Sequence, residues 1–175
     1  MARILKPAAD VTCSVVFSEC GKYRYLLKRD WTPEDQTPKI LVSIGLNGST
    51  ADGQDDDPTI SKETRFARMW GFTALWKVNL FGYRATEPKD MLKTNAPVGP
   101  ENDRYLLEAV EQAHMILCSW GAHGKHLRRG EKVVALLKNR PLYILKLTNN
   151  GQPYHPLFLP ETLTPFVWKT PEQPQ

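Results

Sequence analysis

One stretch, Lys39–Pro58, restricts the fold of this chain more than any other. It reads KILVSIGLNGSTADGQDDDP. Residues 40–44 form a nearly continuous run of apolar and β-branched side chains, which is typical of a strand buried on both faces of a parallel sheet. Small polar residues follow this run directly, at the position where open α/β sheets bind their ligands. The stretch therefore predicts an α/β fold whose ligand site lies in this loop.

The segments after this loop predict alternating helices and strands. Asp57 and Pro58 are typical of a helix N-cap and a first helical position, and we expect this helix to end at Gly71. Because strand–helix–strand units have one handedness, Asn47 and Asn79 are expected at the same edge of the sheet. The remaining elements are expected as strands over 72–81, 115–120 and 142–147, and as helices over 100–114 and 130–139, with a short helical turn over 88–92.

Together these elements predict a three-layer α/β sandwich with a central, mostly parallel four-stranded sheet. Two β-rich runs within residues 11–29 predict a hairpin, which we expect to form an antiparallel appendage. The core is expected over residues 39–160 of a single domain that spans 1–169. Residues 170–175, rich in proline and glutamine, are expected to be a disordered tail.

Composition limits the classes of function. The chain has 175 residues, of which 41% are hydrophobic and 24% charged, as is ordinary for a soluble globular protein. Its net charge of +4 is compatible with a phosphate-bearing partner but too small to establish one. The three cysteines form no CxxC pair, which favours a reducing, cytoplasmic location. Neither a secretion signal nor a membrane-spanning run is present, so no membrane association is expected.

Polar residues follow four of the expected strands, and they are the candidates for a site. An asparagine commonly caps a loop and a histidine commonly packs within one, so each residue alone is weak evidence. The basic residues Lys125, Arg128 and Arg129 are typical of a solvated surface, with a phosphate contact as the alternative. The candidates at the strand ends are Asn47 with Ser49 and Thr50, then Asn79, His123 and His155.

No metal or cofactor is expected. One residue of the acidic run Asp55–Asp57 is needed as the N-cap, and its spacing matches no standard oxygen-ligand loop. His123 and His126 have no third nitrogen or thiolate nearby in the sequence, which argues against zinc. Because the chain lacks a G-x-S-x-G elbow, a P-loop lysine and a G-x-G-x-x-G fingerprint, the serine hydrolases, P-loop NTPases and dinucleotide oxidoreductases are disfavoured.

The sequence resembles, over nearly its whole length, an uncharacterised family of small bacterial and phage proteins, domain of unknown function family 1643. The family usually has a proline where this chain has Gly48, and this difference should loosen the loop. The matching segments are LNGSTAD (46–52), DDPT (56–59), MWGF (69–72), VNLF (78–81), RAT (84–86), PVGPEND (97–103), WGAHG (120–124) and HPLFLP (155–160).

More distantly, the order of these motifs is similar to that of the uracil-DNA glycosylase superfamily. This likeness implies a glycosylase-like fold, in which Asn47 positions the attacking water, Asn79 reads the amide edge of a base and His155 stabilises the leaving base. It also implies a hydrolase or DNA-binding protein of DNA repair or phage DNA modification, with nucleic acid or a nucleotide as partner. The other residues expected to contact a ligand are Gly45, Ser49, Thr50, Arg84, His123 and Tyr154.

The chemistry of N-glycosidic bond cleavage suits these residue types. Negative charge develops on the departing base, so a donor such as His155 is more useful than a strong nucleophile. An amide such as Asn79 can both donate to and accept from a base edge. Asn47 orients water but cannot act as a base, so a slow enzyme is expected, with Asp52 as the best candidate base.

Three functions remain open from the sequence. The first is an enzyme that excises a damaged or modified base from nucleic acid or a nucleotide. The second is a non-catalytic nucleic-acid or nucleotide binder of the same fold. The third is a metal-dependent hydrolase built on Asp52, Asp56 and Asp57. The sequence indicates neither the substrate base nor the oligomeric state.

Overall fold

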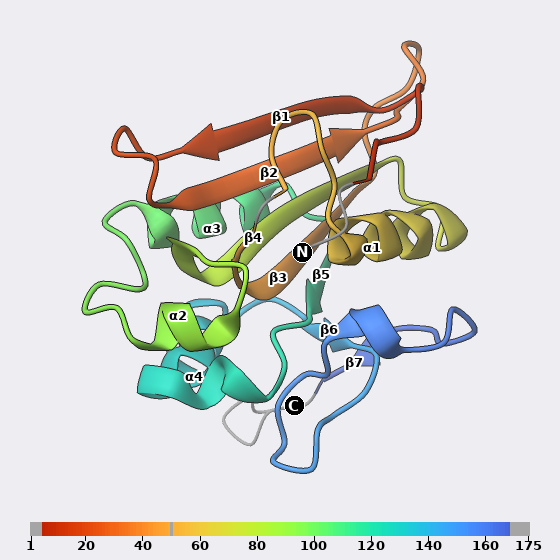
Figure 1. Ribbon diagram of the computed structural model, residues 1–175. Coiled ribbons are helices and arrows are strands. Elements are labelled where there is room, and N and C mark those ends of the chain that lie inside the picture. Colours follow the sequence, from red (N-terminus) through yellow and green to blue (C-terminus); the bar gives the residue numbers. More distant parts are fainter. Residues whose placement is uncertain (1–4, 50, 169–175) are drawn as a thin grey trace.

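The computed structural model describes residues 5–49 and 51–168 and shows an α/β fold built on one mixed sheet (Figure 1). The sheet has seven strands in the order β1-β2-β4-β3-β5-β6-β7. The strands are β1 (Thr12–Phe17), β2 (Arg24–Asp30), β3 (Ile40–Gly48), β4 (Ala74–Arg84), β5 (Met115–Cys118), β6 (Tyr143–Ile144) and β7 (Phe166–Val167). The α-helices are α1 (Pro58–Met69), α2 (Pro88–Leu92), α3 (Asn102–Glu111) and α4 (Arg129–Leu136), and 3-10 turns are η1 (Ala122–Arg128) and η2 (Pro156–Phe158).

The strands pair in parallel at the centre of the sheet and antiparallel at its edges. β3 pairs in parallel with β4 and β5, and β5 pairs in parallel with β6. The expected hairpin forms from β1 and β2, but it is not an appendage, because β2 pairs antiparallel with β4. The sheet therefore has more strands than the expected four. The hairpin covers an edge of β4 whose backbone groups would otherwise be unpaired.

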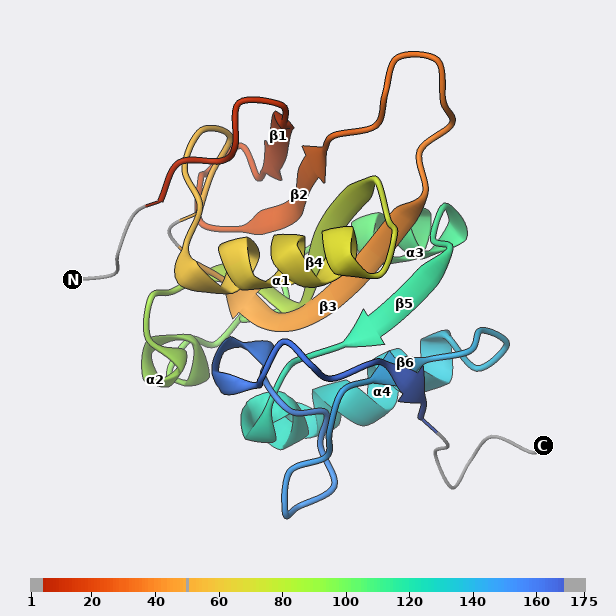
Figure 2. The ribbon, with the colours of Figure 1, turned by 90° about the vertical axis from the view of Figure 1, so that its right-hand side faces the viewer.

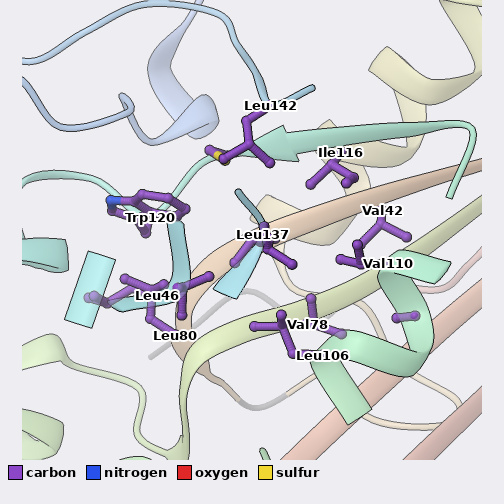
Figure 3. Close-up of a cluster of buried hydrophobic side chains, with 14 of the residues drawn as sticks. Val42, Leu46, Val78, Leu80, Leu106, Val110, Ile116, Trp120, Leu137 and Leu142 are labelled. Atoms are coloured by element: carbon purple, nitrogen blue, oxygen red, sulfur yellow. The ribbon is translucent and has the colours of Figure 1, made fainter. Parts of the chain in front are cut away.

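Helices cover both faces of the sheet, with α1 on one face and α3 on the other (Figure 2). β3 supplies both cores because its side chains alternate. Leu41 packs with Phe66 and Ala67 of α1, in a cluster on one face. Val42 and Leu46 belong to a larger cluster on the opposite face, which includes residues of α3 and α4 (Figure 3). This two-sided burial explains the continuous apolar run that begins at residue 40.

The helix α1 begins and ends where the sequence predicts. Asp57 is its N-cap and accepts a hydrogen bond from the backbone N–H of Ile60 at 2.8 Å, and Pro58 is the first helical residue. Gly71 follows the helix with φ of +77°, a conformation that favours glycine. The N-cap fixes the first turn of α1 beside the carboxyl-terminal part of β3, and this is where the candidate site lies.

The C-terminal part departs most from expectation. The strand expected over 142–147 is reduced to β6, because the chain leaves the sheet and bends back through an isolated bridge between Leu147 and Pro153. β7, η1 and η2 were not predicted. The expected disordered tail, 170–175, lies outside the described residues. Among the residues that the structure describes, no helix is long and apolar enough to cross a membrane.

Candidate functional site

A pocket of about 240 Å³ lies at one end of the α1 face of the sheet. Asn47, Asn79 and His155 all line it, although more than a hundred positions separate the first from the last. The start of α1, the start of α2 and the segment before η2 form its walls; Figure 2 shows α1 and α2 near this end of the sheet. The structure thus brings together the three residues that the sequence placed at different strand ends.

Asn79 is the most unusual residue of the pocket. It is 1% exposed, and neither its Nδ2 nor its Oδ1 has a hydrogen-bond partner in the structure. The side chain of Asn102 donates to the backbone oxygen of Asn79 at 2.9 Å. A buried polar atom without a partner costs about 1–3 kcal/mol. An amide that lacks both partners in a pocket is the arrangement expected for a group that binds a ligand.

Gly45 lies at the floor of the pocket, where its lack of a side chain makes room for Lys77 and Asn79. A Cβ atom on this residue would lie 2.7 Å from Nζ of Lys77 and 2.9 Å from Oδ1 of Asn79. No side chain fits there unless the two neighbours move. The ammonium group of Lys77 and the amide oxygen of Asn79 therefore pack directly against the backbone of β3, and a side chain at residue 45 would displace both.

Replacement of Gly45 by alanine is expected to weaken ligand binding at least about tenfold, because the new methyl group displaces Lys77 and the amide of Asn79. Overpacking should also lower the free energy of unfolding by about 1–3 kcal/mol. Calorimetric titration and urea unfolding measure the two effects. Gly53→Ala is the matched control, since its Cβ would meet only Val15 at 3.4 Å. Unchanged ligand affinity in Gly45→Ala would show that the ligand contacts neither Lys77 nor Asn79.

A buried polar cluster lies under the pocket and includes Lys77, which also lines the pocket wall. The Nζ of Lys77 donates to Oε1 of Glu63 at 2.7 Å and to the hydroxyl groups of Ser43 and Ser119 at 3.0 and 3.3 Å. The side chains of Lys77 and Glu63 are 5% and 0% exposed. The cluster holds the ammonium group in one position close to Asn79.

His155 presents a hydrogen-bond donor in its neutral form. Its Nδ1 accepts the backbone N–H of Leu157 at 3.4 Å, so the neutral ring carries its proton on Nε2. Burial lowers the pKa of His155 below 6.5, and the charge of Lys77 lowers it further, whereas Glu63 and Asp57 oppose the shift. At neutral pH the imidazole is therefore uncharged and can donate from Nε2.

The lowered pKa of His155 makes the protein less stable in acid. In the unfolded chain the histidine binds a proton near pH 6.5, while in the folded chain it does so only at lower pH. Its contribution to stability is present above pH 6.5 and is lost as the pH falls through the folded-state pKa. Urea unfolding of wild type and His155→Gln between pH 7.5 and about 4.5 should show a shallower decline for the variant. Parallel curves would contradict this prediction.

Asn47, Ser49 and Asp57 form the rim near the start of α1. The Nδ2 of Asn47 donates to the backbone oxygens of Gly48 and Ala85, each at 2.8 Å, which fixes the amide and leaves Oδ1 as an acceptor. Asp57 accepts from the Ile60 N–H with one oxygen and from the Ser49 hydroxyl with the other. Thr50, predicted to contact a ligand, lies outside the described residues.

Several predicted site residues lie elsewhere. Asp52 does not line the pocket; its carboxylate accepts the N–H groups of Gln54 and Asp55 at 2.8 and 2.9 Å, and these bonds lower its pKa. Tyr154 packs against the core on the α1 side of the sheet. His123 is exposed in η1. Asp52 therefore shapes its own loop and lies outside the lining of the pocket.

The predicted phosphate-binding cluster does not reach the pocket either. Lys125 is exposed, and Arg128 pairs with Glu131 on the surface. Arg129 is 5% exposed; its Nε donates to the backbone oxygen of Leu80 at 2.8 Å and its guanidinium pairs with Asp103. Arg129 thus stabilises the packing of α4 against β4 and α3.

The acidic residues of the loop are engaged with the protein itself. Asp56 pairs with the buried Arg29 at 2.7 Å, Asp55 pairs with Lys6, and Asp57 caps α1. Across residues 5–49 and 51–168, no group of three or more His, Cys, Asp or Glu side chains is placed to hold a metal ion. The loop geometry therefore gives no support to a metal-dependent hydrolase.

Sequence reasoning missed three charged residues of the site: Arg24, Glu63 and Lys77. Lys77 carries the clearest signal, because a lysine inside the apolar run FTALWKVNL has no solvent to face. Glu63 and Arg24 carry none, since each lies among other charged or polar residues in the sequence.

The comparisons with known proteins give one match. A family model described as "Protein of unknown function (DUF1643)" matches residues 24–157. The matched segment begins with Arg24 in β2 and extends past His155, so it contains all the residues that line the pocket. Searches of curated proteins and of solved structures found no match.

Proposed function

Since the chain belongs to the DUF1643 family, whose description names no activity, we propose a function from the site: the protein recognises one nucleobase and hydrolyses its N-glycosidic bond, as a glycosylase does. The observation that carries this proposal is the side-chain amide of Asn79, buried in the pocket with neither atom bonded. The distant likeness to uracil-DNA glycosylases agrees with it but comes from motif order alone.

The amide of Asn79 matches a base edge that offers a donor beside an acceptor. Its Oδ1 accepts and its Nδ2 donates, so a lactam edge, with an N–H beside a C=O, fits it, as does an amino group beside a ring nitrogen. Uracil, thymine, hypoxanthine and guanine have this lactam edge. The other groups on the pocket wall that are free to donate are Arg24 and Nε2 of His155. Lys77 adds a positive charge, although its three N–H groups already donate within the buried cluster. A base rich in carbonyl oxygens therefore suits the pocket better than one that presents only an amino group.

The size of the pocket supports a single ring system. Its volume of about 240 Å³ lies below the range of about 300–1,000 Å³ that is usual for drug-sized ligands. A base fits within such a volume, while its sugar and phosphate remain outside. A nucleotide in a polymer must then leave the base stack to enter.

The neutral His155 fits the role of stabilising the departing base. When the glycosidic bond breaks, its electron pair goes to the base and water adds to C1′ of the sugar. A donor at Nε2 stabilises the charge that develops on a base oxygen. The fixed Oδ1 of Asn47 can orient the water. Without a carboxylate base beside it, hydrolysis is expected to be slow.

One observation favours a non-catalytic binder as the second candidate. Asp57 is the carboxylate that lines the pocket, and both its oxygens already accept hydrogen bonds from Ile60 and Ser49. A site without a free base could retain recognition and lack hydrolysis.

Incubation with oligonucleotides that carry uracil, hypoxanthine or modified pyrimidines tests the proposal and separates the two candidates. We expect abasic sites to form from at least one lactam base, and His155→Ala to reduce their formation about 100-fold while base binding remains. Lys138→Gln, an exposed residue far from the pocket wall, serves as control. Binding without cleavage of any substrate would favour the second candidate. Absence of both would overturn the proposal.

A further inference from the structure

Arg24 is a buried cation, and the negative charge of Asp57 acts on it without a salt bridge between the two. Arg24 lines the pocket and is 2% exposed. Its Nη1 donates to the backbone oxygen of Ala51 at 2.8 Å, while its Nε has no partner. Among the described residues, no carboxylate forms a salt bridge with it. Burial lowers its pKa to about 10, so it is still charged at neutral pH. A buried charge that forms no salt bridge destabilises the protein, and an anion bound beside it would reduce this cost.

Arg84, which is only partly buried, is a second arginine beside Arg24. Its guanidinium stacks on the ring of Phe17 at 4.5 Å and donates to the backbone oxygen of Gly21 at 3.2 Å, but its Nε is buried without a partner. No salt bridge to Arg84 is present in the described part of the chain either. The charge of Arg84 contributes to the lowered pKa of Arg24, which shows that the two cations interact.

Gly48 lies between the two arginines. A Cβ atom on this residue would be 3.2 Å from Cβ of Arg24 and 3.4 Å from Cγ of Arg84. The absence of a side chain here lets both arginines pack against the end of β3. Two like charges side by side destabilise the protein unless an anion lies near both.

A second hollow, of about 310 Å³, continues from the pocket at this point. Lys22, Tyr83 and Arg84 line it, and Ser49, Ala85 and Thr86 line both hollows. A ligand can therefore extend from Asn79, past Arg24, to Arg84 and Lys22. The base end of this path carries charges of both signs, whereas its outer end is basic.

We propose that Arg24 and Arg84 bind the phosphate group of a nucleotide whose base contacts Asn79. The contact between the base and Asn79 rests on the proposed function, whereas the phosphate contact is argued from the two arginines alone. Phosphate oxygens accept hydrogen bonds from guanidinium groups, which are the usual recognition groups for phosphate. The ligand is thus a nucleoside phosphate, either free or as part of a nucleic acid chain.

Calorimetric titration with matched ligands tests this assignment. The ligands are deoxyuridine, deoxyuridine monophosphate, deoxyinosine and its monophosphate, a single-stranded oligonucleotide with one uracil, and inorganic phosphate. Each is measured with wild type, Arg24→Gln, Arg84→Gln and the control Lys138→Gln. Thermal unfolding shows which variants are folded, and Arg84→Gln, which is less buried than Arg24→Gln, keeps the test valid if the latter does not fold.

We expect each monophosphate to bind at least about tenfold tighter than its nucleoside, and this advantage to fall below about threefold in Arg84→Gln. Nucleoside affinity should remain unchanged in that variant. If the advantage appears only in the oligonucleotide and depends on Arg84, the phosphate comes from a nucleic acid chain.

The phosphate site is overturned if neither the monophosphates nor the oligonucleotide bind tighter than the nucleosides, or if their advantage survives in folded Arg84→Gln. Binding of inorganic phosphate that depends on Arg84, without binding of any nucleoside, would support the phosphate site and refute the base pocket. Binding of nucleosides, without tighter binding of any phosphate-bearing ligand, would support the base pocket and refute the phosphate site.

Discussion

Replacement of Asn79 by leucine should lower affinity for a lactam base about 100-fold and leave the unliganded protein as stable as wild type, or more stable by about 1 kcal/mol. The two effects have one cause. In the absence of ligand the amide is buried without partners, so an apolar side chain of similar size removes a cost. With ligand present, both hydrogen bonds to the base edge are lost. Titration calorimetry and urea unfolding measure the two quantities on the same samples.

The control for Asn79→Leu is Asn139→Leu, at an exposed position outside the pocket, which should leave affinity unchanged. A marked loss of stability in Asn79→Leu would show that the amide has a structural role. Unchanged affinity would show that the base edge is read elsewhere.

The second large effect concerns the buried pair under the pocket. Lys77→Met should lower the free energy of unfolding by about 3–5 kcal/mol, because it leaves Glu63 buried without its counter-ion. The double variant Lys77→Met with Glu63→Leu should recover most of this loss, since two apolar side chains replace the whole pair. Urea unfolding of the two single variants and the double variant forms a thermodynamic cycle.

The exposed pair Arg104–Glu108 provides the comparison, and its removal should cost far less stability than Lys77→Met. A similarly small loss in Lys77→Met would mean that Glu63 is solvated or neutral. Failure of the double variant to recover stability would mean that the serines of the cluster require the charges.

The central part of the fold could be predicted from local sequence signals. The apolar run of β3 and the Asp57-Pro58 start of α1 each encode one element through short-range physics. The extent of the sheet could not be predicted in this way. A hairpin pattern over 11–29 shows that two strands pair with each other, but it does not show that β2 docks on β4.

The residues of the site also fall into those that local sequence reveals and those that only the complete fold reveals. Asn47 and Asn79 follow apolar runs, so topology brings them together and the sequence reveals them. Arg24 and Lys77 become part of the site through burial, which depends on the whole fold. Arg129 illustrates the opposite error: among basic neighbours it resembles a surface residue, yet its partners Leu80 and Asp103 come from distant elements.

The most direct test is nuclear magnetic resonance of the side-chain amide of Asn79, assigned by comparison with Asn79→Leu. On titration with deoxyuridine monophosphate, we predict that its NH₂ signals move and saturate with the amount bound, while deoxycytidine monophosphate, which lacks the lactam edge, moves them much less. Signals that stay in place while a lactam base or nucleotide binds would contradict recognition of a base by Asn79, and an equal response to both nucleotides would contradict its preference for the lactam edge.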